Sequence, residues 1–323
     1  MPKVRVGFGL GTHTGAAADP QAFGALCDDL DRLGFDSLWL SERVNGSAPD
    51  PLVAMSYVAG RTAHLKFGTS VLVLPGRNPV LLAKALASLD VLSGGRVLPA
   101  VGLGAVDPRE QAAFGVDRAE RGARFDEMIE LMRRCWTGDE VTFAGTHYAV
   151  EGVRVQPTPV QQPLDLWLGG RARSELRRCG RLGDGWLPSF CDAADVAAGI
   201  PVVQEAAAEA GRTMDPEHWG ALVAYAKAPL PDAVVAAIEA RQPDKRAADL
   251  IPIGYDALRA RLVELVDAGA SKFVVVPVDE PTTWRAELEG LAGGAALQTR
   301  CASSAARSGS ESRRWWREFA GQR

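Results

Sequence analysis

The sequence predicts a (β/α)8 TIM barrel with an insertion after strand four, on three observations. Eight short apolar runs, rich in β-branched and aromatic residues and bounded by Gly or Pro, recur along the chain. Segments with helical periodicity lie between them, so strand and helix alternate. The runs are apolar throughout, which is typical of parallel strands covered on both faces. An open, doubly wound sheet is the alternative, because a strand count from sequence errs by about one or two.

The expected strands share this apolar character and lie at residues 4–10, 36–40, 65–74, 96–103, 164–169, 185–188, 219–226 and 272–277. The spacing between the fourth and fifth strands is about twice that between the earlier ones, so residues 104–163 form the insertion. It contains an amphipathic helix, ERGARFDEMIELMRRCW, and continues as a hairpin and an extended arm. We expect one barrel domain over residues 1–290. A disordered tail is expected over residues 291–323, because this segment is rich in small, polar and basic residues.

Five Asx-Pro pairs predict helix starts. The Asp or Asn side chain caps the first turn, and proline lacks an N–H that would have no helical partner there. The pairs are Asp19-Pro20, Asp50-Pro51, Asn78-Pro79, Asp107-Pro108 and Asp215-Pro216. Three glycines lie where helix C-caps are expected, at Gly34, Gly94 and Gly269.

Composition and charge indicate a soluble cytoplasmic protein. The chain has 36 Lys and Arg against 40 Asp and Glu, a net charge of −4, with 47% hydrophobic residues. This balance gives no reason to expect nucleic acid or an anionic membrane as a partner. The five cysteines have no metal-binding or disulfide-framework spacing. Neither a signal peptide nor an apolar run of about 18 residues is visible.

Candidate site residues follow the strand ends, because a barrel places its active site at the carboxyl ends of its strands. His13 follows the first strand and Glu42 the second, whereas Ser70 lies within the third and Gly102 and Gly104 end the fourth. The alternatives are a solvated loop histidine at 13 and a surface ion pair between Glu42 and Arg43. The fourth-strand glycines lack the third glycine of a dinucleotide fingerprint.

The fifth strand ends in Gly169-Gly170, where two glycines let a ligand approach the backbone. Ser174 is expected to cap the following helix, whose N-terminal amides would face an anion with Arg171 nearby. The alternative is that the arginines of this helix form a solvated face. No histidine or carboxylate cluster suggests a metal, and no GxSxG motif suggests hydrolysis. The residues alone therefore predict a barrel enzyme that binds a phosphorylated ligand near strand five, with its reaction undefined.

Four motifs resemble the bacterial-luciferase-like monooxygenase family, most closely its actinobacterial branch that uses the deazaflavin coenzyme F420. They are GFDSLWLSER, GTSVLVLPGRNPVLLAKALASLDVLSGGRV, ERGARFDEMIELMRRCWTG and LWLGGRARSELRRCGRLGDGWLP, in the family's order and spacing. The resemblance extends from about residue 4 to about residue 290. It implies a (β/α)8 barrel whose flavin or deazaflavin ring lies in the barrel mouth.

The resemblance also implies roles for single residues. Ser70-Val71 matches a strand-three position that often has a non-prolyl cis peptide behind the ring, and Glu42 matches an acidic position near it. Gly169 and Gly170 match the loop at the cofactor's phosphate, and the neighbouring loop is Asp184, Gly185 and Trp186. Arg43 replaces the histidine of the sugar-phosphate dehydrogenase members, and Ala105 replaces their glutamate. These two departures argue against glucose 6-phosphate as the substrate.

We therefore expect an F420-dependent oxidoreductase that transfers a hydride between the deazaflavin and a small organic substrate. Glu42 is the first candidate for the catalytic acid or base and His13 the second. An FMN-dependent luciferase-like monooxygenase and a non-catalytic flavin-binding barrel are the alternatives. Family members are commonly homodimers, and the apolar helices at 50–60 and 79–89 predict a dimer through that half.

Overall fold

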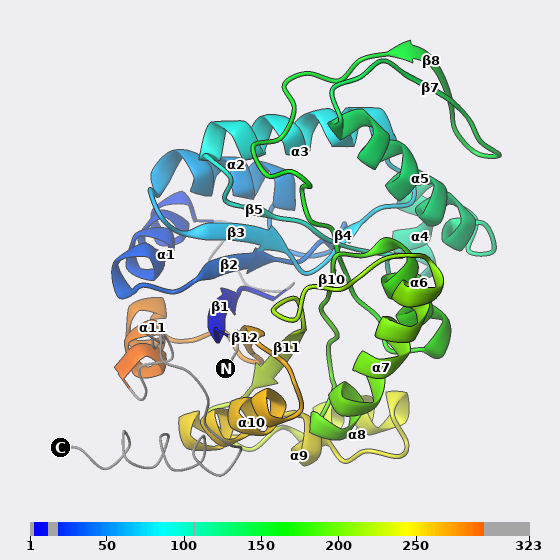
Figure 1. The fold of residues 1–323 in the computed structure, drawn as a ribbon. Coiled ribbons are helices and arrows are strands. Elements are labelled where there is room, and N and C mark those ends of the chain that lie inside the picture. Colours follow the sequence, from blue (N-terminus) through cyan, green and yellow to red (C-terminus); the bar gives the residue numbers. More distant parts are fainter. Residues whose placement is uncertain (1–2, 12–18, 106, 294–323) are drawn as a thin grey trace, which may run out of the picture.

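The computed structural model describes residues 3–11, 19–105 and 107–293, and its parallel strands lie inside a ring of helices (Figure 1). The strands are β1 (Arg5–Gly9), β2 (Ser37–Leu40), β3 (Lys66–Thr69), β4 (Leu72–Val73), β5 (Val97–Leu98), β6 (Ala100–Gly102), β7 (Val141–Ala144), β8 (Ala149–Val153), β9 (Trp167–Leu168), β10 (Gly185–Trp186), β11 (Gly220–Tyr225) and β12 (Lys272–Pro277). The helices are α1 (Pro20–Leu33), α2 (Pro51–Arg61), α3 (Pro79–Ser93), α4 (Pro108–Phe114), α5 (Arg121–Trp136), α6 (Arg173–Leu182), α7 (Ala193–Glu209), α8 (Asp232–Arg241), α9 (Ala247–Leu250), α10 (Tyr255–Asp267) and α11 (Trp284–Gly293).

Each of the eight predicted apolar runs contains a strand, and the strands pair in parallel. One sheet has the order β11-β12-β1-β2-β3-β5, and the other has the order β10-β9-β6-β4. Isolated parallel bridges between Trp186 and Trp219 and between Ser189 and Leu222 join the β10 segment to β11. The strand order is therefore the one expected of a (β/α)8 barrel.

The third and fourth runs each divide into two strands, one in each sheet. A cis peptide between Ser70 and Val71 separates β3 from β4, and Pro99 separates β5 from β6. The Thr69 hydroxyl donates to the Ala100 carbonyl at 2.6 Å and accepts from the Ala100 N–H at 3.0 Å. These bonds keep the two runs adjacent where both change sheets.

Four of the five Asx-Pro predictions are confirmed. Asp19, Asp50, Asn78 and Asp107 each cap a helix whose first residue is proline. The fifth prediction is wrong, because the Asp215 side chain accepts the N–H of Glu217 at 2.7 Å and forms a turn in place of a helix.

Gly34 and Gly94 end α1 and α3 in the left-handed conformation, as predicted. Gly269 is also left-handed, but it lies one residue beyond Ala268, which caps α10.

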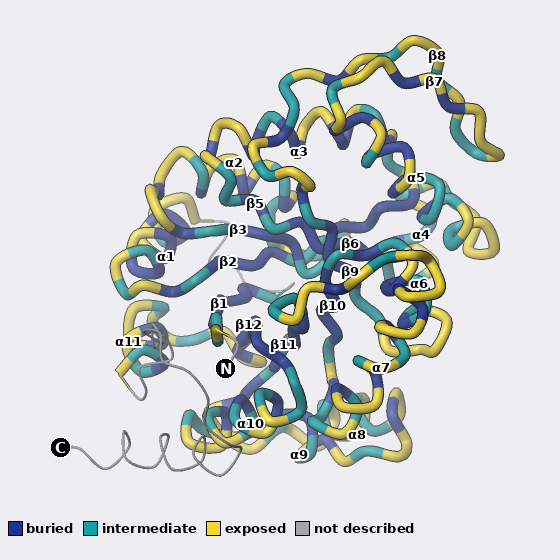
Figure 2. Tube along the Cα trace, in the orientation of Figure 1, coloured by how far each residue is buried: buried dark blue, intermediate teal, exposed yellow. Residues whose placement is uncertain are grey.

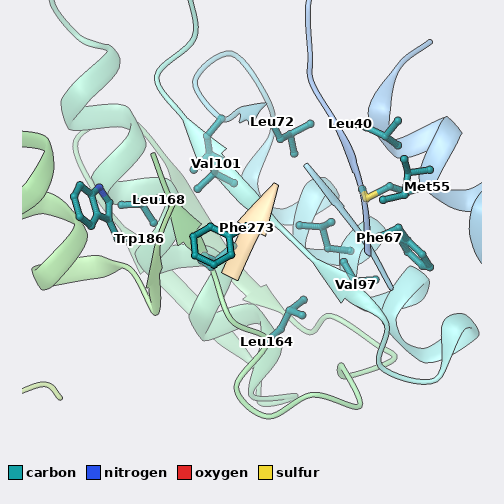
Figure 3. Close-up of a cluster of buried hydrophobic side chains, with 14 of the residues drawn as sticks. Leu40, Met55, Phe67, Leu72, Val97, Val101, Leu164, Leu168, Trp186 and Phe273 are labelled. Carbon is teal, nitrogen blue, oxygen red and sulfur yellow. The ribbon is translucent and has the colours of Figure 1, made fainter. Parts of the chain in front are cut away.

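The core lies between the strands and their helices, where the trace is buried along nearly every strand (Figure 2). Side chains from both sheets meet there, as the close-up of Phe67, Val101, Leu168, Trp186 and Phe273 shows (Figure 3). Each of these five is at most 2% exposed. Such packing fixes the positions of the strand ends that carry the site.

The insertion after strand four contains α4, α5 and the β7–β8 hairpin, and the hairpin projects away from the strands (Figure 1). Two i,i+4 ion pairs form on the predicted amphipathic segment, Glu120 with Arg124 and Glu130 with Arg134. The predicted domain end at residue 290 falls inside α11, whose Leu291 is only 3% exposed. The folded chain therefore reaches at least Gly293, and most of the predicted tail lies outside the described residues.

Candidate cofactor and active site

A cavity of about 400 Å³ opens at the carboxyl ends of β2, β4, β6 and β9. Its walls come from those strand ends, from the loop before α6, from the segment after β10 with β11, and from the first two turns of α5 and α6. The lining residues are Ser41, Glu42, Arg43, Ser70, Val71, Val73, Val101, Gly102, Leu103, Gly104, Ala105, Arg121, Phe125, Leu168, Gly169, Gly170, Glu175, Arg178, Leu187, Ser189 and Leu222. Its size is within the usual range for ligand pockets.

The cis peptide between Ser70 and Val71 is present, as the resemblance implied, and it forms part of this wall. The Ser41 hydroxyl donates to the Ser70 carbonyl at 3.0 Å, and the Glu42 N–H donates to the Val71 carbonyl at 3.3 Å. A Cβ at Gly102 would lie 2.6 Å from Val71 Cγ2, so any larger residue there would require Val71 to move. The strand-four glycine thus makes room for the Val71 side chain.

Glu42 lines the cavity but does not pair with Arg43. Its Oε2 accepts the Val73 N–H at 2.6 Å, and its Oε1 is bonded to the Arg77 guanidinium. The side chain is 7% exposed. Burial raises the pKa of this carboxyl above its ordinary value, while Arg77 and the Val73 N–H act in the opposite direction. The alternative interpretation, a surface ion pair between Glu42 and Arg43, is therefore wrong. The sequence analysis did not identify Arg77 as the partner of Glu42.

Arg43 lies beside Glu110, the buried carboxylate of α4. Glu110 accepts the N–H groups of Val44 and Asn45 at 3.0 and 2.9 Å, and its Oε1 is 3.6 Å from Arg43 Nε. It therefore fastens α4 to the loop that carries Arg43. No local pattern predicts this contact, which joins a helix residue to a loop more than 60 residues earlier in the chain.

The loop before α6 differs from the prediction at its cap. Ala172 precedes the helix, and Glu175 Oε2 accepts the N–H groups of Arg171 and Ala172 at 2.9 Å each. Ser174 is therefore not the cap. Gly170 has φ +100°, and a Cβ there would lie 2.7 Å from the Glu175 carboxylate. Glycine at 170 is thus required by the loop itself, whatever ligand lies beside it.

Asp184, Gly185 and Trp186 lie behind the cavity wall and are not among its lining residues. The Asp184 carboxylate accepts from Arg133 at 2.6 Å, from Arg212 at 2.7 Å and from the Leu166 N–H at 2.9 Å. The Trp186 indole N–H donates to the Gly170 carbonyl at 2.9 Å. This segment supports the Gly169-Gly170 loop and does not itself face the cavity.

Arg171, which was predicted near an anion site, does not line the cavity, and its guanidinium donates to Gln242 at 2.6 Å. Arg121 lines the cavity, and its Nη1 is buried with no hydrogen-bond partner in the described part of the chain. Burial lowers the pKa of Arg121, and the Arg118 charge acts in the same direction. Arg178 lies alongside, since a Cβ at Gly122 would be 3.1 Å from its Nη2. Sequence reasoning missed Arg121.

Two further expectations concern His13 and metals. His13 lies outside the described residues. Across residues 3–11, 19–105 and 107–293, no three or more His, Cys, Asp or Glu side chains are grouped so as to hold a metal ion. In the same ranges, none of the helices combines the length and apolarity needed to span a bilayer.

The sequence pattern of the luciferase-like monooxygenase family matches residues 4–272. An F420-dependent glucose-6-phosphate dehydrogenase of Kineococcus radiotolerans is 32% identical over 213 residues, which cover 61% of this chain and 62% of that protein. The chain thus spans about three-fifths of the length of this relative.

Two solved structures share the fold. An F420-dependent secondary alcohol dehydrogenase in complex with an F420-acetone adduct is 18% identical, with a TM-score of 0.75 and coverage of 91% of this chain and 99% of that one. The oxygenating constituent of 3,6-diketocamphane monooxygenase from Pseudomonas putida, in complex with FMN, is 17% identical, with a TM-score of 0.69 and coverage of 89% and 96%. On the match over residues 4–272, the chain belongs to the luciferase-like monooxygenase family.

Proposed function

We propose that the chain is an F420-dependent oxidoreductase that transfers a hydride between the deazaflavin and a small organic substrate. The observation that carries the proposal is the buried, unpartnered Nη1 of Arg121. Arg121 lines the same cavity as Val71 and the glycines at 102, 104, 169 and 170. A buried guanidinium nitrogen without an acceptor is costly unless a ligand supplies one. Bound F420 would bring a phosphodiester for that position and a ring carbon that exchanges hydride.

The residues present suit such a ligand. Arg121 and Arg178 would bind its phosphate, since guanidinium groups bind phosphate oxygens through paired N–H donors. The Gly169-Gly170 backbone would lie against its chain, and Val71 and Gly102 would border its ring. Arg178 also contacts Asp126 at 2.5 Å, which holds its guanidinium in place.

Glu42 is the proposed acid–base residue, because it lines the cavity next to Val71 and its pKa is raised by burial. A carboxylate has about four acceptor positions, so its bonds to Val73 and Arg77 leave positions for a substrate proton. Arg77 fixes the carboxylate, which is what a positioned proton carrier requires. His13 is the second candidate.

The choice of F420 over FMN is supported by the F420-dependent relative, whereas the solved structures include enzymes of both kinds. The test is a titration of the apoprotein with each cofactor, followed by tryptophan fluorescence and by oxygen uptake of the reduced complex. We expect F420 to bind more tightly than FMN, with no appreciable oxygen uptake. Tighter binding of FMN with oxygen uptake would establish the monooxygenase alternative, and binding of neither cofactor would overturn the proposal.

A homodimer and a cytoplasmic location are also proposed. Val53 of α2 and Leu81 of α3 are 66% and 68% exposed, which is unusual for large apolar side chains on adjacent helices. We propose that a second copy covers this face, and a monomer mass in light scattering at micromolar concentration would contradict it. The cysteines at 27, 135, 179 and 191 are buried free thiols, which suits a reducing compartment.

A further inference from the structure

Arg43 has a second buried and unsatisfied guanidinium nitrogen in the same cavity. Its Nε is buried without a hydrogen-bond partner among the described residues, although the side chain as a whole is 35% exposed. A guanidinium has five N–H donors and no acceptor. The nearest carboxylate oxygen, Glu110 Oε1, is 3.6 Å from Nε, which is too far for a hydrogen bond. Glu110 thus pairs with the charge of Arg43 but accepts no hydrogen bond from Nε, and the 35% exposure of the side chain leaves the guanidinium within reach of a ligand.

The neighbouring carboxylates are already occupied. Glu110 accepts two backbone N–H groups, from Val44 and Asn45, and its side chain is 3% exposed. Glu42 is bonded to Arg77 and to the Val73 N–H. Each carboxylate holds backbone in place, and neither reaches the Arg43 guanidinium with a hydrogen bond. Arg43 thus differs from Arg77, whose guanidinium is bonded within the protein.

Arg43 lines the cavity from a different element than Arg121 and Arg178 do. Arg43 follows β2, and the N–H of the preceding residue, Glu42, donates to the carbonyl of Val71, the second residue of the cis peptide. Arg121 and Arg178 come from α5 and α6, beside the Gly169-Gly170 loop. If the cofactor phosphate occupies the second pair and the ring borders Val71, Arg43 faces the space left for the substrate.

We propose that Arg43 is the substrate-recognition residue of this site and that the substrate carries a carboxylate. This inference rests on the proposed function, which defines where the cofactor ends and the substrate begins. A carboxylate matches the guanidinium fork through two parallel hydrogen bonds. Glu110 and the nearby Asp107 place negative charge around Arg43, so a singly charged group is favoured over a doubly charged phosphate.

The test compares matched anions and neutral analogues by calorimetry on the protein loaded with oxidised F420. Acetate, hexanoate and benzoate are each paired with the corresponding amide, and inorganic phosphate is titrated separately. We expect at least one carboxylate to bind at least about tenfold more tightly than its amide. Arg43→Gln should weaken that carboxylate by about tenfold or more, because the charge-assisted pair is lost. Arg43→Lys should fall between, because lysine cannot bind bidentately.

The control is Arg173→Gln, which removes an exposed arginine from the first turn of α6. It should leave the binding of every probe unchanged, and the thermal midpoint of each variant shows whether it has folded. Affinity for F420 should stay within about twofold in Arg43→Gln, which separates this role from cofactor binding.

Three outcomes would overturn the inference: no carboxylate binds better than its amide, Arg43→Gln binds carboxylates as wild type does, or phosphate binds more tightly than all carboxylates in an Arg43-dependent way. Failure of F420 to bind wild type is a different result and contradicts the proposed function. The same carboxylate and amide titrations on the apoprotein would then still test Arg43.

Discussion

The two ends of the strands differ in how completely their buried cations are hydrogen-bonded within the protein. At their amino ends, Lys272 of β12 is paired with Asp36 before β2 at 2.8 Å, and the two side chains are 4% and 14% exposed. At their carboxyl ends, Arg43 Nε and Arg121 Nη1 are buried without hydrogen-bond partners in the described part of the chain. Removing one partner of the buried pair leaves an uncompensated charge, whereas each of these two arginines has a buried N–H donor that no described group accepts.

The largest effect is expected for the buried ion pair between Lys272 and Asp36 at the amino ends of the strands. Asp36→Ala leaves the Lys272 ammonium buried and unpaired, and should lower the free energy of unfolding by about 3–5 kcal/mol. Urea unfolding measures this. Glu130→Ala, which breaks the exposed pair with Arg134, is the control and should cost well under about 1 kcal/mol. Equal costs for the two variants would remove the distinction between the buried pair and a surface pair.

A substitution at Glu42 tests the cavity at the carboxyl ends of the strands through its effect on turnover. Glu42→Gln should lower turnover by roughly 10²-fold or more, as expected on loss of a general acid–base group, while the protein still folds. Turnover is measured with a substrate chosen from the carboxylate class proposed for Arg43. The control is Glu151→Gln on the exposed β8 strand, which should turn over as wild type does. A single-turnover rate for Glu42→Gln within about threefold of wild type would leave His13 as the remaining candidate.

The same residue predicts a pH dependence of stability. Because the folded pKa of Glu42 is raised, the folded protein binds this proton more tightly than the unfolded chain does. The contribution of Glu42 is therefore full below its ordinary pKa and is lost as pH rises through the raised value. The free energy of unfolding of wild type minus that of Glu42→Gln should fall over this window. A difference that rises or stays flat would contradict the burial argument.

A smaller effect is expected from the glycine behind Val71. Gly102→Ala would place a Cβ 2.6 Å from Val71 Cγ2, so the cis segment must shift. Overpacking of this kind costs about 1–3 kcal/mol, and displacement of Val71 should also weaken F420 binding. Gly60→Ala in α2 is the control, because a Cβ there meets nothing within 4 Å. Unchanged F420 affinity in Gly102→Ala would remove Val71 from the cofactor wall.

The sequence predicted features set by local chemistry and failed where distant residues meet. The caps at Asp19, Asp50, Asn78 and Asp107 depend on a few neighbouring residues, so they could be read directly. Asp215 failed because the same side chain can close a turn as readily as it caps a helix.

The site itself was located more accurately than its contacts. Glu42, Gly102 and Gly169 line the cavity as the strand-end rule and the resemblance predicted. The partner of Glu42 is Arg77, 35 residues away, and no local pattern distinguishes it from the adjacent Arg43. Arg121 likewise reads as one more polar residue of an amphipathic helix. Only its burial without an acceptor identifies it as a ligand-facing group.

The central claim is that the cavity at the carboxyl ends of the strands binds F420 through Arg121. Its most direct test is the dissociation constant of F420 for wild type, Arg121→Gln and Arg173→Gln, measured by fluorescence titration at one ionic strength. We predict that Arg121→Gln weakens F420 binding by about tenfold or more, because a charge-assisted bond to phosphate is lost, while Arg173→Gln binds as wild type does. Equal affinity of wild type and folded Arg121→Gln would contradict the account.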